Sequence, residues 1–150
     1  MTSLLRTPED YELFLYTLQD QFESIRSSTM TFVRRGSSLA RVSGEIKFDH
    51  EIRLVIMERV LFDRLPAVID AYGYEVWREE EKLYWYDSQP HPDDEPLQST
   101  HPHHKHVPPD IKHNRIPAPE MSFSEPNIPT LIEEIEKLIE TIEENGPQAS

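Results

Sequence analysis

A proline-rich stretch in the second half of the chain constrains the fold more than any other feature. Eight of the protein's 13 prolines lie between residues 84 and 119. Proline lacks a backbone N–H and clashes with the preceding helical turn, and it removes a ladder hydrogen bond from a central strand. We therefore predict an irregular loop over residues 88–128. Long irregular segments inside compact domains are commonly functional.

Histidines are concentrated in the same stretch. Five of the protein's seven histidines fall within sixteen residues: His91, His101, His103, His104 and His106. Imidazole has an unperturbed pKa close to neutrality, which suits both proton transfer and metal ligation. The functional site is therefore expected in this histidine-rich loop.

Composition limits the class of protein. The chain has 150 residues, enough for one domain with a substantial core. It has no cysteine, which excludes a disulfide framework, a thiolate nucleophile and a Cys-type zinc site. No apolar run is long enough to span a bilayer, and the first residues lack a signal-peptide pattern. We expect a soluble, cytoplasmic protein that does not enter a membrane.

The charge of the chain is strongly acidic but unevenly distributed. A net charge of −13 argues against broad electrostatic attraction to nucleic acid. Residues 26–47, however, carry five basic side chains against a single Glu. Within this segment we take Arg34 and Arg35 as candidate substrate contacts. The acidic remainder suits a basic partner protein or self-association.

Apolar residues recur at steps of three and four in one segment near each end of the chain, which is typical of amphipathic helices. The first segment follows Thr7, a favourable N-cap, and Pro8, a favourable first helical residue. It predicts a helix over residues 8–26. The second predicts a helix over residues 130–144, because an Asn-Gly-Pro stop follows it.

Between these helices, β-branched and aromatic residues predict several strands. Turn signals at residues 36–38 and the charged run at residues 78–81 separate the strands from one another. We predict an antiparallel sheet with meander topology over residues 28–87. A helix, then strands, then a helix is not a βαβ pattern, so the expected fold is a single compact α+β domain with both helices packed on the sheet.

Metal-independent cleavage of RNA is the first function that suits the histidine-rich loop. The 2′-hydroxyl attacks its own phosphodiester, and two imidazoles take up and give back protons. His104 and His106 are two residues apart, so they point to the same side of an extended backbone, whereas Lys105 points to the other. Asp87 ends the preceding strand and could orient either imidazole, as a fixed carboxylate does in a triad.

The other groups needed for this chemistry lie in the same stretch. A cation such as Lys105 could stabilise the charge that develops on the phosphoryl oxygens. Tyr84, Trp85 or Tyr86 could stack a nucleic-acid base.

Two other functions suit the same residues. A metal site could use imidazole ligands from the four clustered histidines His101, His103, His104 and His106. Their spacing matches no standard zinc motif, so we predict no metal and no cofactor. Alternatively, the loop packs on the sheet and the protein is a non-catalytic module that binds a partner through its acidic surface.

Several of these residues together resemble the TumE-type toxin family of prokaryotic toxin–antitoxin systems. That family has a tyrosine-rich strand, a Tyr-Asp-Asn-x-Pro-His stretch and a Pro-His-His-Lys-His motif. The matching residues are Tyr72-Gly73-Tyr74, Tyr86-Asp87, His91 and Pro102-His103-His104-Lys105-His106. Ser88 stands where the motif has Asn. The resemblance covers about residues 52–142.

The resemblance implies an endoribonuclease toxin that acts on mRNA and is neutralised by an antitoxin encoded beside it. The expected partners are that antitoxin, the RNA substrate and a second copy of the chain. The catalytic candidates are Asp87, His91, His103, His104, Lys105 and His106.

Overall fold

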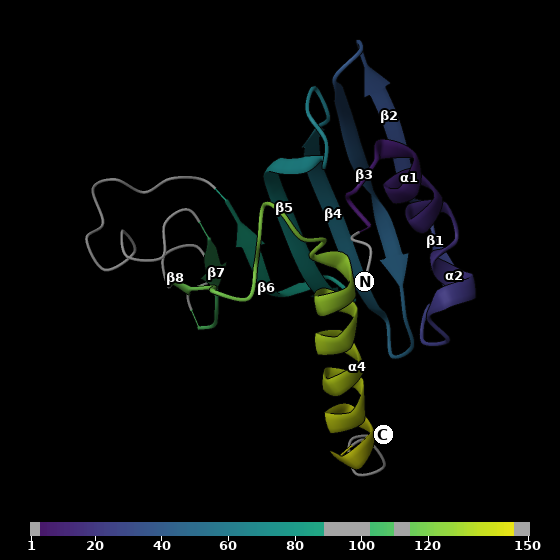
Figure 1. Cartoon of the computed structure of the whole chain (residues 1–150). Helices are drawn as coiled ribbons and strands as arrows, with labels where there is room; N and C mark the ends of the chain where they lie inside the picture. The colour runs from purple at the N-terminus through teal and green to yellow at the C-terminus, as the bar shows by residue number, and fades with distance from the viewer. Residues whose placement is uncertain (1–3, 89–102, 110–114, 146–150) are drawn as a thin grey trace.

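The computed structural model describes residues 4–88, 103–109 and 115–145. Its helices are α1 (Pro8–Tyr16), α2 (Leu18–Gln21) and α4 (Ile128–Asn145). Its strands are β1 (Ser27–Ser28), β2 (Thr31–Arg35), β3 (Leu39–Lys47), β4 (Ile52–Leu61), β5 (Val68–Arg78), β6 (Glu81–Asp87), β7 (His104–His106) and β8 (Arg115–Pro117). Figure 1 shows α1, α2 and β2 at one edge of the sheet and β7 and β8 beyond β6 at the other.

The eight strands form one antiparallel sheet in the order β1-β3-β4-β5-β6-β7-β8, with β2 also paired to β3. From β3 onward each strand therefore pairs with the next in the chain, which makes a meander. The prediction of an α+β domain with an antiparallel sheet and a helix near each end is confirmed.

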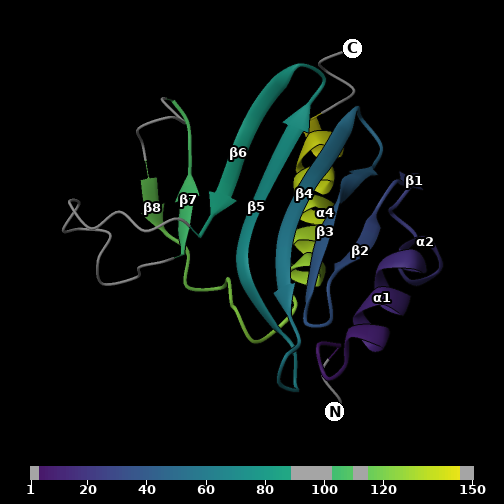
Figure 2. The same cartoon turned by 90° about the horizontal axis from the view of Figure 1, so that it is seen from above.

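The core fills one face of the sheet. Alternate residues of β4 (Ile52, Leu54 and Ile56) are buried there, as are four apolar residues at the start of α4: Ile128, Leu131, Ile132 and Ile135. Figure 2 shows α4 behind β3 and β4, with none of the described helices in front of them. We call the covered side the helix face and the other side the open face.

The first helix is shorter than the predicted 8–26. Thr7 caps it as expected, its hydroxyl accepting from the amide of Asp10 at 3.1 Å. The Thr17 hydroxyl then donates to the carbonyl of Leu13 at 2.7 Å, and α1 ends at that turn. After the four-residue α2, the backbone is extended at Phe22. Ile25 is buried nonetheless, so the apolar spacing reaches the core without a continuous helix.

The predicted loop over residues 88–128 is not irregular throughout. Within it, β7 pairs with β6 and β8 pairs with β7, so part of the histidine run is a strand. β8 ends with Pro117 at the sheet edge, where the missing N–H removes no ladder bond between central strands. The C-terminal helix begins at Ile128, two residues earlier than predicted.

Candidate functional site

Strand pairing brings three of the predicted catalytic residues together. β6 and β7 pair so that Asp87 lies opposite His104 and Trp85 lies opposite His106. Because side chains alternate along a strand, Asp87, His104 and His106 share the open face, and Lys105 lies on the helix face. The expected alternation of His104, Lys105 and His106 is therefore observed. We call the first three residues the Asp87 centre.

The Asp87 carboxylate is shared between the two imidazoles of this centre. Its Oδ2 lies 3.2 Å from Nε2 of His106, and its Oδ1 lies 3.6 Å from Nδ1 of His104. The exposed fractions of the side chains are 9% for Asp87, 2% for His106 and 0% for His104. A buried carboxylate in this position restricts the orientation of each ring.

An aromatic ring also fixes the position of His106. The indole of Trp85 stacks on the imidazole with the ring centroids 3.7 Å apart and an angle of 11° between their planes. His106 is thus held in two ways: the Asp87 carboxylate contacts one ring nitrogen, and the Trp85 indole covers one face of the imidazole. This preorganisation is what a proton-transfer group needs.

His103 belongs to a different environment from the other two histidines. Its Nδ1 lies 2.6 Å from the hydroxyl of Tyr72, and its ring contacts Phe123 with centroids 4.6 Å apart. Burial, and then the charges of Asp87 and Glu120, raise the pKa of Tyr72 well above its usual range. The structure therefore separates His103 from the Asp87 centre, although His103 and His104 are adjacent in sequence.

Lys105 also lies apart from the Asp87 centre, in a cluster that attaches α4 to the sheet. Its ammonium is 3.6 Å from the Glu134 carboxylate and lies over the rings of Tyr84 and Tyr86, at 4.4 Å and 5.1 Å. The Tyr86 hydroxyl donates to Glu134 at 2.7 Å, and burial followed by this hydrogen bond raises the pKa of Tyr86.

These contacts argue against three predicted roles. The Tyr86 side chain is completely buried, so its ring face is not available for stacking a base. The ring of Tyr84 is partly buried and covered by Lys105. Lys105 in turn faces Glu134 on α4 instead of a phosphate on the open face.

Glu134→Ala is therefore expected to lower the free energy of unfolding by roughly 1–3 kcal/mol, because it leaves the Tyr86 hydroxyl and the Lys105 ammonium without their acceptor. Urea denaturation measures the effect. Glu133→Ala, an exposed neighbour on the same helix, should change stability by no more than about 0.5 kcal/mol. Equal losses in the two variants would contradict the anchoring role of Glu134.

The two predicted arginine contacts lie far from the Asp87 centre. Arg34 pairs with Glu9 and Glu12 of α1 at 3.1 Å and 3.4 Å, so it holds that helix against β2. Arg35 is exposed at the end of the same strand. Five strand spacings separate β2 from β7, roughly 24 Å of sheet. These arginines and the Asp87 centre therefore do not form one compact site.

Two of the remaining candidate residues, one catalytic and one a metal ligand, are not described. His91 and His101 lie outside the described residues. Within the described ranges, no three His, Cys, Asp or Glu side chains are grouped so that they could hold a metal ion.

No helix in the described part of the chain is long and apolar enough to cross a membrane.

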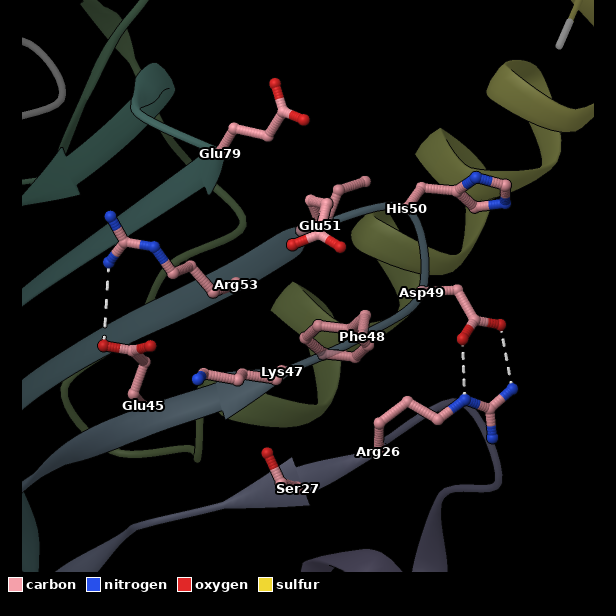
Figure 3. A pocket seen from close by; sticks show the side chains of 11 residues that line it. Arg26, Ser27, Glu45, Lys47, Phe48, Asp49, His50, Glu51, Arg53 and Glu79 are labelled. Carbon is pink, nitrogen blue, oxygen red and sulfur yellow. Dashed lines mark hydrogen bonds and ion pairs between the residues drawn. The ribbon is translucent and has the colours of Figure 1, made fainter. Parts of the chain in front are cut away.

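A pocket of about 510 Å³ lies where the β3–β4 and β5–β6 hairpins turn (Figure 3). Charges of both signs line it, and several are paired: Arg26 donates to both oxygens of Asp49 at 2.7 Å and 2.8 Å, and Arg53 lies 3.6 Å from Glu45. Part of the charge in this pocket is therefore neutralised by ion pairs within it.

A buried carboxylate on the helix face was not predicted. Glu58 accepts from the hydroxyls of Tyr11 at 2.6 Å and Tyr74 at 2.5 Å, and it is 1% exposed. Burial raises its pKa to about 7, although the two tyrosine hydrogen bonds act to lower it. The signal was present in the sequence, because Glu58 shares the alternation of Ile56 and Val60 on the buried side of β4.

The fold and the Asp87 centre together define a small antiparallel α+β protein in which one buried carboxylate serves two imidazoles. The chain belongs to the TumE family, because the model of the family described as toxin TumE matches residues 14–139. This match confirms the resemblance and extends it towards the N-terminus, beyond the expected start at residue 52. No curated protein and no solved structure matches the chain.

Proposed function

We propose that this protein is the toxin of a cytoplasmic toxin–antitoxin pair and that it cleaves RNA without a metal ion. The observation that carries the proposal is the Asp87 carboxylate between His104 and His106, at 3.6 Å and 3.2 Å. Membership of a toxin family supports the biological role and an antitoxin partner.

The chemistry assigns one imidazole to each proton transfer. One histidine takes the proton of the 2′-hydroxyl as that oxygen attacks the adjacent phosphorus. The other gives a proton to the 5′-oxygen as its bond to phosphorus breaks. The products are a 2′,3′-cyclic phosphate and a 5′-hydroxyl. Asp87 orients both rings and stabilises whichever is protonated.

A second candidate function is a partner-binding module without catalysis. The observation that favours it is the burial of the Asp87 centre, since His104 is 0% exposed and His106 is 2% exposed. In that case Asp87 and the two histidines would join β7 to β6, and the acidic surface of the chain would bind a basic partner.

An RNA cleavage assay in EDTA separates the two functions. The purified protein is incubated with a 5′-labelled RNA, and the new ends are identified by their reactivity with a kinase and a phosphatase. The proposal expects cleavage with cyclic phosphate and 5′-hydroxyl ends. Intact RNA together with tight binding of the product of the neighbouring gene would favour the binding module.

A further inference from the structure

Cations and an aromatic ring form a row across the open face. Strand register places Lys47, Arg53, Trp77 and Lys82 side by side on β3, β4, β5 and β6. The residues that alternate with them along β4 and β5, such as Leu54 and Val76, are buried on the helix face. We call these four residues the cation row.

Contacts within the row hold its charges in place. The Arg53 guanidinium lies over the Trp77 ring, 4.7 Å from the centroid. The Lys82 ammonium lies 5.3 Å from Trp77 and 5.1 Å from Trp85, and Glu75 holds it at 3.3 Å. Trp85 in turn stacks on His106. A continuous series of cations and rings therefore leads across the sheet to the Asp87 centre.

A glycine leaves space on the open face beside this centre. Register places Gly73 of β5 between Met57 of β4 and Asp87 of β6. A Cβ built on Gly73 would meet no described atom within 4 Å. Glycine inside a strand weakens it and often marks a place where a ligand approaches closely. The gap thus lies next to the carboxylate that the proposed reaction uses.

We propose that the open face binds single-stranded RNA, with the cation row contacting the phosphates and the Gly73 gap admitting the strand to the Asp87 centre. This inference rests on the proposed cleavage of RNA and identifies where that substrate lies. Rows of fixed cations with aromatic rings are the usual surface for single-stranded nucleic acid.

The distribution of charge supports this orientation of the RNA. The open-face positions of β3 and β4 carry four basic residues, Arg41, Lys47, Arg53 and Arg59, against one acidic residue, Glu45, which lies 3.6 Å from Arg53. In contrast, α4 on the other side of the sheet has six glutamates and a single lysine, Lys137. Part of the net charge of −13 thus lies on α4, on the side of the sheet opposite the open face. A polyanion would meet this face with less repulsion than it would meet α4.

Binding of a short 2′-O-methyl RNA, which lacks the attacking hydroxyl and cannot be cleaved, tests the surface separately from catalysis. Fluorescence anisotropy over a range of salt concentrations measures Kd and its salt slope. Arg53→Gln and Lys82→Gln should each weaken binding and lower the slope by about 0.7, the value for one contact to a single strand. Gly73→Val should weaken binding at least as much as Lys82→Gln, although valine favours a strand.

Lys137→Gln is the matched control, because it removes an exposed cation from α4 and should leave Kd and slope unchanged. Equal effects of Lys137→Gln and Lys82→Gln would overturn the assigned surface. The assigned surface would also be overturned if the parent cleaves RNA and the open-face variants bind the oligonucleotide as tightly as the parent does. The proposed cleavage of RNA would then stand. A parent that neither binds nor cleaves RNA would overturn both.

Discussion

Replacing His106 by alanine is expected to slow RNA cleavage by about 10²–10⁴-fold, the usual cost of removing a general acid or base. Of the two histidines, His106 lies closer to Asp87, at 3.2 Å, and it also stacks on Trp85. His104→Ala should cause a loss of the same order, since the reaction needs both an acceptor and a donor of a proton. Cleavage is measured under single-turnover conditions in EDTA.

Asp87→Asn is expected to reduce cleavage through both imidazoles at once. The asparagine keeps the size of the side chain but removes the charge that stabilises a protonated ring. The double variant Asp87→Asn with His106→Ala should lose little more activity than either single variant, because the effects of substituting residues that act as a unit are not additive. Circular dichroism and urea denaturation establish that each variant remains folded, which matters for side chains as buried as these.

His103→Gln is the matched control for these variants. His103 is the neighbour of His104 and was itself a catalytic candidate, but it faces Tyr72 at 2.6 Å on the other side of the strand. We expect cleavage by His103→Gln to equal that of the parent. If His103→Gln lost activity while His104→Ala and His106→Ala kept it, the assignment of the Asp87 centre would be wrong.

The sheet and the C-terminal helix were predictable because local patterns determine them. The alternation in β4 and the three- and four-residue spacing of α4 each bury one side of the element. The end of α1 was not predictable from apolar spacing, because Ile25 keeps that spacing and reaches the core although it follows a turn after α2. Periodicity shows which residues are buried. It does not show whether the backbone that carries them is a continuous helix.

The candidate site was only partly predictable for a related reason. Strand β7 has three residues and forms by pairing with β6, and no local signal within a proline-rich stretch indicates such a pairing. Once β7 is an extended strand, side-chain alternation separates Lys105 from His104 and His106. Lys105 was a catalytic candidate because it lies between the two histidines in the sequence, but the sheet places it on the opposite face. The contact of Asp87 with the two histidines depends on register, which the sequence does not reveal.

The second large effect concerns the buried carboxylate of Glu58. The contribution of Glu58 to stability is expected to fall as the pH rises from about 4.5 to about 7, because burial raises the pKa of Glu58 from 4.5 to about 7. In that interval the unfolded chain has released the Glu58 proton and the folded protein still holds it, so ionisation favours unfolding. The difference between the two pKa values corresponds to roughly 3 kcal/mol of unfolding free energy above neutrality.

Glu58→Gln should remove this pH dependence, because its amide stays neutral in both states while it can still bond to Tyr11 and Tyr74. Urea denaturation between about pH 5 and about pH 8 should show that the variant loses less stability than the parent as the pH rises. Glu133→Gln, which changes an exposed carboxylate on α4, should follow the parent curve. Parallel curves for the parent and Glu58→Gln would show that Glu58 is already ionised in the folded protein at about pH 5. The Tyr11 and Tyr74 hydrogen bonds would then outweigh the cost of burying the charge.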